Sequence, residues 1–404
     1  MARKPAKSSS PSSRVPIVSV APMVDVTDRH FRSLIRIMTK RTLLYTPMFL
    51  ARRVAQRKRH EVAQMLLFRP EELPLAVQLG GNDVRHIMGA ARKCQDAGFS
   101  EINLNLGCPA GTAQERNFGA TLMKPPHDKI THLVRTMTSQ LDTPVSVKVR
   151  IGVDSHDDYP FFRDFIGRLH AQGGCNRFVV HARKALLDGI STRQNRLDEL
   201  VPLRHEWVYR LKQEMPHVHI EINGGIKSID DMQTHLAHPC GLDGVMMGRL
   251  ARDDPFAFTN IDASLFGDAH IWKHLSPLEG RMEVLRQYAE YALAEQDQGV
   301  ESRREMLLRP TNQLFQGLPV EKRVFASLLR SPSAADRPQM FGQELLQVLQ
   351  QLPAAVDSER KHMATQKRWS PRYQQQPPDT PQKRAIKAIQ SPFPAWAKKK
   401  KPNK

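Results

Sequence analysis

Eight short apolar segments recur along the first 250 residues, and they constrain the fold more than any other feature of the chain. They occupy residues 15–21, 43–48, 73–79, 101–106, 144–149, 177–182, 219–224 and 244–249. Between most of them lie segments with the three-and-four spacing of amphipathic helices, at residues 28–39, 82–98, 127–141, 159–173 and 205–216. Strands that alternate with helices in this way predict an α/β fold, a (β/α)8 TIM barrel. A doubly wound open sheet is the alternative, but no GxGxxG follows the first segment.

The domain boundaries follow from the same pattern and from a change in composition. We expect a barrel over residues 15–262, a C-terminal helical domain over 270–352, and disordered ends at 1–14 and 353–404. The helical domain carries cations that could contact phosphates: Arg303, Arg304, Arg309, Lys322 and Arg323.

The formal net charge of +19 is uneven along the chain. From Ala354 onward there are 13 Lys or Arg against 3 Asp or Glu, so about half of the excess belongs to the tail. Such a charge suits a polyanionic partner better than a small neutral metabolite. The tail itself could be a solubilising extension, an RNA-binding arm with interleaved aromatic residues, or a nuclear address.

Localisation and oxidation state are constrained only loosely. The four cysteines, Cys94, Cys108, Cys175 and Cys240, form no CxxC pair, which fits a reducing compartment and argues against a structural zinc site. No apolar run approaches the roughly 20 residues that a membrane span requires. We therefore expect a soluble, cytoplasmic monomer without metal; the basic ends would also suit a mitochondrial or nuclear protein.

Polar residues and glycines gather where the expected strands end. In a barrel these ends meet at one mouth, where the chemistry takes place. The residues concerned are Pro22, Met23, Gln78, Asn105, Gly107, Cys108, Lys148, Arg150, His181, Arg183, Asn223, Gly224, Gly225, Gly248 and Arg249. The glycines and Arg249 supply groups that could hold a phosphate, and Gln78, Lys148 and His181 could face a planar electron-accepting ring. A flavin mononucleotide fits this set better than a sugar phosphate does.

Cys108 stands at the open end of the fourth expected strand, within the sequence NLNLGCPAG. A lone intracellular cysteine is more often a space-filling core residue than a reactive one. At a strand end of a barrel, however, a thiol could act as a nucleophile or an acid.

Several motifs together resemble the tRNA-dihydrouridine synthases. They are VAPMVDVTDRHFR, AVQLGGND, EINLNLGCP, NFGATLMK, PVSVKVRIGVD, VVHARKALLDGISTRQNR, HIEINGGI and DGVMMGRLARDDP. The stretches HARKALLDGIS, LRHEWVYRLK and REMLLRPTNQLFQGLPVEKRVFASLL resemble specifically the A-type bacterial branch, which acts on D-loop uridines near tRNA position 20. The resemblance covers the chain from about Val15 to Leu352.

The resemblance implies an FMN enzyme that uses NADPH to reduce the C5–C6 bond of uracil in tRNA, at position 20 or 20a. It implies that Cys108 donates a proton to C5 while reduced FMN delivers hydride to C6. Flavin contacts would come from Pro22, Met23, Gln78, Lys148, His181, Asn223, Gly224, Gly225, Gly248 and Arg249, and substrate contacts from Asn105, Arg150 and Arg183. The helical domain would grip the tRNA.

This chain departs from the family pattern at a few positions. Ala110 follows GCP where Ser is usual, and Thr112 and Ala113 replace an arginine and a valine of the A-type loop. Pro47 replaces a Glu, and Pro310 replaces a His of the helical motif. These changes bear on the tRNA position chosen. Two other functions stay open at this point, a small-molecule flavin barrel of the dihydroorotate dehydrogenase kind and a non-catalytic tRNA-binding protein.

Overall fold

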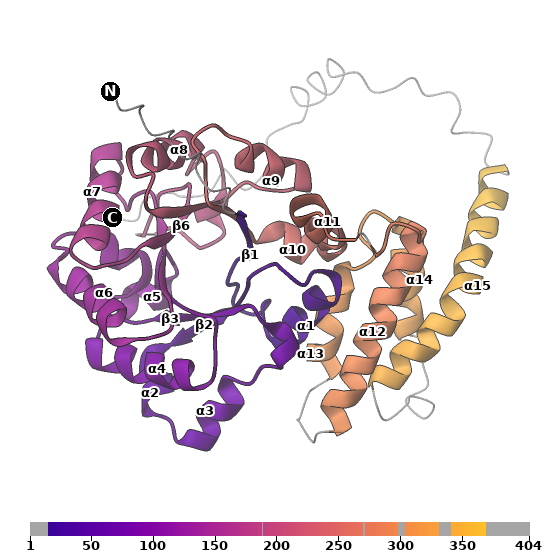
Figure 1. Cartoon of the computed structure of the whole chain (residues 1–404). Helices are drawn as coiled ribbons and strands as arrows, with labels where there is room; N and C mark the ends of the chain where they lie inside the picture. Colours follow the sequence, from indigo (N-terminus) through magenta and orange to yellow (C-terminus); the bar gives the residue numbers. More distant parts are fainter. Residues whose placement is uncertain (1–14, 188, 270, 298–303, 331–340, 369–404) are drawn as a thin grey trace, which may run out of the picture. The chain divides into compact units, whose positions relative to one another are not determined.

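The computed structural model describes residues 15–187, 189–269, 271–297, 304–330 and 341–368. Residues 1–14, most of the basic tail and Arg303 lie outside the described residues. The structure therefore does not test the disorder predicted for the two ends or the role predicted for Arg303. A barrel of strands surrounded by helices occupies the first part of the chain, and helices alone make up the rest (Figure 1).

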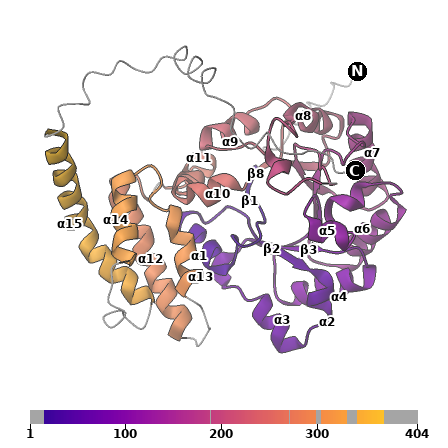
Figure 2. The ribbon, with the colours of Figure 1, turned by 180° about the vertical axis from the view of Figure 1, so that it is seen from behind.

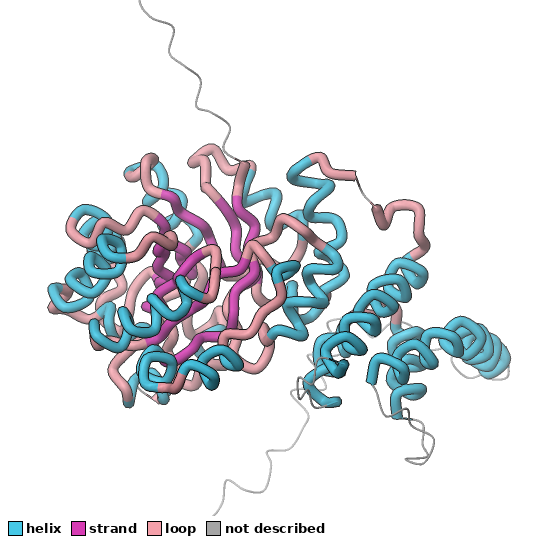
Figure 3. The backbone as a smooth tube through the Cα atoms, turned by 60° about the horizontal axis from the view of Figure 1, so that its bottom comes forward, coloured by secondary structure: helices cyan, strands magenta, loops and turns pink. Residues whose placement is uncertain are grey.

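All eight expected strands are present and parallel. They are β1 (Ile17–Val20), β2 (Leu44–Leu50), β3 (Leu75–Gly80), β4 (Glu101–Leu106), β5 (Val145–Arg150), β6 (Arg177–His181), β7 (His219–Asn223) and β8 (Gly244–Met247). Their order in the sheet is β1-β8-β7-β6-β5-β4-β3-β2. A bridge between Ser19 and Leu43 joins the two remaining edges and closes the barrel. Figure 2 shows β1 beside β8, and Figure 3 shows the strands enclosed by helices. The prediction of a TIM barrel is confirmed.

The expected barrel helices are also present, with a few that the sequence pattern did not reveal. The helices of the barrel are α1 (Arg29–Met38), α2 (Ala51–Gln56), α3 (Arg59–Met65), α4 (Val84–Asp96), α5 (Gly111–Glu115), α6 (Asp128–Gln140), α7 (Tyr159–Ala171), α8 (His205–Glu214), α9 (Ile229–Leu236), α10 (Arg249–Asp253) and α11 (Ile261–Phe266). Asp28 caps α1 by accepting a hydrogen bond from the backbone N–H of Phe31, as its position before the apolar pattern predicts. Short α2, α3 and α9 were missed because each offers only about two turns of periodicity.

The helical domain contains α12 (Pro277–Asp297), α13 (Arg304–Leu308), α14 (Pro319–Arg330) and α15 (Phe341–Arg368). Pro353, at the expected start of the disordered tail, lies inside α15. The helix continues because the residues after Pro353 are mostly good helix formers such as Ala, Glu, Lys and Met. No described helix is long and apolar enough to cross a membrane.

Apolar residues of the strands face the helices, whereas the inside of the barrel is largely polar. Ile102, Leu104 and Leu106 are fully buried on the outer face of β4. Each such side chain contributes about 1.5–3 kcal/mol when it is removed from water. Glu101 and Glu221 lie on the inner side, where both pair with Arg177 at the amino end of the barrel. Burying three charges together is tolerable only because they pair.

The first barrel helix packs directly on α12 of the helical domain. His30 of α1, which is fully buried, hydrogen bonds through Nδ1 to the hydroxyl of Tyr291 over 2.8 Å. Glu295 pairs with Arg69 over 2.9 Å and with Arg29 over 3.1 Å. The carboxylate of Glu295 on α12 therefore forms ion pairs with two separate segments of the barrel, at Arg29 and at Arg69.

We expect Glu295→Gln to lower the free energy of unfolding by about 2 kcal/mol, because two guanidinium groups would lose a nearly buried partner. Glu290→Gln is the matched control, since Glu290 lies on the same helix and its side chain is 58% exposed. Urea denaturation of both variants measures the difference. Equal stability of the two would show that the Glu295 contacts contribute nothing to the junction.

Candidate functional site

A cavity of about 170 Å³ opens at the carboxyl ends of the strands. It is lined by Ala21, Pro22, Met23, Lys148, His181, Arg183, Arg196, Asn223, Gly224, Gly225, Ile226, Met246, Gly248 and Arg249. Most of the predicted site residues are in this set; Gln78, Asn105, Cys108 and Arg150 are not. Residues at or after the carboxyl ends of β1, β5, β6, β7 and β8 therefore meet at this cavity.

Two glycines after β7 form one wall of the cavity. Gly224 has φ of +109° and Gly225 has φ of +82°, values that other residues rarely adopt. A Cβ on Gly224 would lie 2.6 Å from the Cδ2 atom of His181, and one on Gly225 would lie 2.6 Å from Leu203. His205 bonds through Nε2 to the carbonyl of Gly224 over 2.8 Å and helps to fix the turn. Bare backbone in such a turn is a common anion-binding element.

A partly buried lysine and a partly buried histidine line the cavity together with this glycine turn. The ammonium of Lys148 donates a hydrogen bond to Asn223 Oδ1 over 3.0 Å. Burial lowers the pKa of Lys148 to about 7, and the nearby charge of Arg150 acts in the same direction. The pKa of His181 is also lowered, by burial and then by Arg150 and Lys148, so its ring is neutral. An anion bound here would offset this crowding of positive charge.

The loop that carries Cys108 is held from both sides. Asn105 Oδ1 accepts hydrogen bonds from the backbone N–H groups of Gly107, over 3.1 Å, and Cys108, over 3.0 Å. Arg150 Nε donates to the carbonyl of Gly107 over 2.9 Å, and the N–H of Ala120 donates to the carbonyl of Cys108 over 2.9 Å. The backbone around the thiol is thus already ordered.

The thiol of Cys108 is outside the core. Cys108 is partly exposed, whereas Cys94 and Cys175 are fully buried, so the space-filling interpretation applies to those two. A negative charge on Cys108 would raise the pKa values of both Lys148 and Arg150. The sulfur therefore lies within electrostatic reach of the cavity.

The side-chain amides of two predicted contact residues form hydrogen bonds within the protein. Gln78 is buried; its Nε2 donates to Asn103 Oδ1 and its Oε1 accepts from Asn105 Nδ2, both over 2.8 Å. Asn105 Nδ2 also donates to the sulfur of Met48 over 3.3 Å. Asn105 would have to exchange a partner to bind a uracil, because both of its N–H groups and both acceptor sites of its oxygen are in use. Gln78 keeps one N–H and one acceptor site for a ligand.

The two arginines predicted to bind substrate also donate hydrogen bonds to groups of the protein itself. Arg150 donates through Nη1 to the carbonyl of Lys184 over 2.8 Å. Arg183 donates to the carbonyl of Val201 and, over 2.7 Å, to a carboxylate oxygen of Asp198. Both arginines are nearly fully buried. In this structure they hold the loops around the mouth.

Arg196 is a cavity residue that the sequence interpretation missed. It belongs to the short helix η3 (Gln194–Arg196) in the long loop after β6. The neighbouring Asn195, fully buried, bonds the N–H of Leu186 over 2.8 Å and its carbonyl over 2.7 Å. Burial and the charges of Arg252 and Arg249 lower the pKa of Arg196. The loop has no periodic pattern, so only the adjacent Asn195 could have signalled a fixed position.

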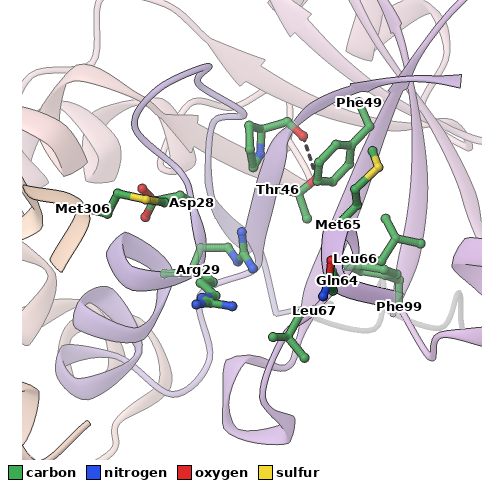
Figure 4. Close-up of a pocket in the computed structure, with 12 residues that line it drawn as sticks. Asp28, Arg29, Thr46, Phe49, Gln64, Met65, Leu66, Leu67, Phe99 and Met306 are labelled. Carbon is green, nitrogen blue, oxygen red and sulfur yellow. Dashed lines mark hydrogen bonds between the residues drawn. The ribbon is translucent and has the colours of Figure 1, made fainter. Parts of the chain in front are cut away.

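A larger cavity, of about 710 Å³, lies along β2 and the helices beside it (Figure 4). Asp28, Phe49, Met65 and Met306 are among its lining residues. Pro47, one of the departures from the family pattern, also contacts it. None of the predicted flavin residues or Cys108 lines it. The polar groups that could perform chemistry meet in the smaller cavity.

Most of the chain is similar to known proteins. A family model described as dihydrouridine synthase matches residues 19–350. The chain is 42% identical over 282 residues to a tRNA-dihydrouridine(20/20a) synthase of Vibrio parahaemolyticus, covering 70% of this chain and 82% of that protein. It is 41% identical over 305 residues to a protein of the same name from Synechocystis, covering 76% and 86%. A third such protein, from Shewanella oneidensis, is 40% identical over 301 residues, covering 74% and 84%. All the predicted site residues lie within the matched range.

Proposed function

The chain belongs to the dihydrouridine synthase family, and we propose that it reduces D-loop uridines of tRNA, at position 20 or 20a, with FMN as cofactor and NADPH as reductant. The observation that carries the proposal is the cavity at the strand ends, where Lys148, a neutral His181 and a double-glycine turn meet and where a charge on Cys108 would act on Lys148. Neither a small-molecule enzyme nor a simple RNA binder accounts as well for this set within this family.

The residues present fit a flavin mononucleotide. The turn of Gly224 and Gly225 admits no side chain, and together with Arg249 it would hold the phosphate. Lys148 and His181 would face the ring, and a cation there stabilises the anionic reduced form. FMN would supply the hydride for C6 of uracil when bound.

The protein's own part in the reaction would fall to Cys108. A thiol placed beside the base can act as a general acid and donate a proton to C5. Its loop is ordered by Asn105 and Arg150, so the donor would be in position before the substrate arrives. A uridine in folded tRNA must leave its stack to reach the mouth, which costs a few kcal/mol. Contacts elsewhere on the tRNA would offset that cost.

Purified protein, FMN, NADPH and unmodified tRNA test the proposal. We expect a yellow protein that forms dihydrouridine at position 20 or 20a, mapped by mass spectrometry of nuclease fragments. A colourless protein that cannot be reconstituted with FMN would favour a non-catalytic tRNA-binding protein instead.

The lowered pKa of Lys148 predicts a pH-dependent affinity for FMN. Above a pH of about 7 the lysine is neutral in the free protein, and it must take up a proton to act as the cation that faces the flavin ring. We expect the Kd for FMN to rise between pH 7 and 8.5, by up to about tenfold per pH unit. The phosphate of FMN is already doubly charged over this range.

Fluorescence titration of FMN at several pH values measures this dependence. The Lys148→Met variant should bind more weakly and with a flat profile over the same range. A wild-type Kd that does not change with pH would show that Lys148 is not the group that responds to the cofactor.

A further inference from the structure

A continuous chain of buried hydrogen bonds runs through the barrel interior from the amino end of β4 toward the Cys108 loop. The carboxylate of Glu101 accepts a hydrogen bond from the hydroxyl of Ser146. Asn103 Nδ2 donates to Ser146 Oγ over 2.6 Å, and Gln78 Nε2 donates to Asn103 Oδ1 over 2.8 Å. These four side chains are all at most 2% exposed.

The upper half of the chain ends on the backbone of the loop. Asn105 Nδ2 donates to Gln78 Oε1 over 2.8 Å, so the oxygen of Asn105 points the other way. That oxygen accepts from the N–H groups of Gly107 and Cys108. Four side chains, those of Ser146, Asn103, Gln78 and Asn105, thus connect the buried carboxylate of Glu101 to the peptide that carries the thiol.

The hydrogen bonds from Glu101 to Asn105 all run in one direction, because the carboxylate of Glu101 at the lower end can only accept hydrogen bonds. An amide side chain can turn over and exchange its donor and its acceptor, but an ionised carboxylate has no proton to donate. The proton of Ser146 is used toward Glu101, so Ser146 can only accept from the next residue. Asn103 must therefore present its nitrogen downward and its oxygen upward. The same constraint passes through Gln78 to Asn105.

Glu101 is well suited to anchor this direction. Burial raises the pKa of Glu101, and the ion pair with Arg177 opposes that shift and favours the ionised form. Tyr45 also donates a hydrogen bond to the same Glu101 oxygen, over 2.9 Å. The hydroxyl groups of Tyr45 and Ser146 thus both donate to the same oxygen of Glu101.

We propose that Asn103 and Ser146 are positioning residues for Cys108, which act through Gln78 and Asn105 to hold the loop in the conformation that presents the thiol. The inference rests on the proton-donor role proposed above for Cys108. Neither Asn103 nor Ser146 lines the cavity, so neither touches cofactor or substrate there. If this series of hydrogen bonds only satisfied polar groups in the barrel interior, breaking one of them would lower the stability of the protein and leave the Cys108 loop unchanged.

The variants Ser146→Ala and Tyr45→Phe separate these two roles. Each removes one buried hydroxyl that donates to the same oxygen of Glu101, but only Ser146 also accepts from Asn103. We expect Ser146→Ala to lower kcat on unmodified tRNA by roughly 10- to 100-fold, with KM for tRNA unchanged, because a small displacement of a reacting group has that effect. Tyr45→Phe should keep kcat within about twofold of wild type.

Alkylation of Cys108 by iodoacetamide gives a second readout that needs no turnover. We expect the rate, followed by peptide mass spectrometry, to change by about threefold or more in Ser146→Ala and to stay unchanged in Tyr45→Phe. Asn103→Leu should behave like Ser146→Ala. Asn103→Asp should alkylate at the wild-type rate, since a carboxylate still accepts from Gln78 and keeps the upper chain in direction.

The proposal is overturned if Ser146→Ala and Asn103→Leu change kcat and the alkylation rate no more than Tyr45→Phe does. A wild-type protein that forms no dihydrouridine would instead refute the proposed function, and the alkylation rates would still decide whether the chain positions the loop. Thermal unfolding of each variant identifies any that fails to fold. If Ser146→Ala or Asn103→Leu fails to fold, the other of the two is compared with Tyr45→Phe.

Discussion

Replacing Cys108 by alanine is expected to lower the rate of dihydrouridine formation by about 10²- to 10⁴-fold, the usual contribution of a positioned general acid. FMN binding should be retained, because Cys108 does not line the cavity at the strand ends. The loop should also keep its shape, since its hydrogen bonds involve the backbone of Cys108 rather than its side chain. Single-turnover assays on unmodified tRNA measure the effect.

The control is Cys240→Ala, because Cys240 is also partly exposed but does not line that cavity. This variant should turn over like wild type. Wild-type rates in Cys108→Ala would remove the proton-donor role from Cys108.

The second large effect is expected at the glycine turn. Gly224→Ala places a Cβ 2.6 Å from the His181 ring on a backbone with φ of +109°. The ring must move, and the left-handed conformation adds about 1–2 kcal/mol of strain. We expect the Kd for FMN to rise roughly 30- to 100-fold, which corresponds to about 2–3 kcal/mol, and the protein to be purified largely colourless.

Gly98→Ala provides a control for backbone strain alone. Gly98 has φ of +88°, and a Cβ there would meet no other atom within 4 Å. This variant should lose some stability but bind FMN as wild type does. Equal FMN affinity in the two variants would show that the turn after β7 does not form part of the cofactor site.

The fold was predictable because its strands repeat one simple pattern. Apolar residues at every second position, as in Ile102, Leu104 and Leu106, mark strands whose outer face is covered by helices. The same pattern places Gly224 and Gly225 at a strand end, where the structure gives both a positive φ. Local spacing was enough for these features.

The hydrogen-bond partners inside the barrel were not predictable from spacing. Gln78 and Asn105 belong to different strands, and only the register between β3 and β4 shows that their amides bond each other. The same holds for Arg150 and Arg183, whose acceptors are carbonyl groups of distant loops. A sequence shows which polar groups are available, but the closed barrel determines how many of them stay free for a ligand.

The way the barrel closes has a consequence for its synthesis. β1 forms its ladder with β8, about 220 residues later in the chain. At about 5–20 residues per second, a ribosome needs roughly 10–45 s to deliver that partner. During this interval the nascent sheet has unpaired strand edges, which are templates for association with other chains. Chaperone demand during translation should therefore end only after the Gly244–Met247 segment has left the exit tunnel.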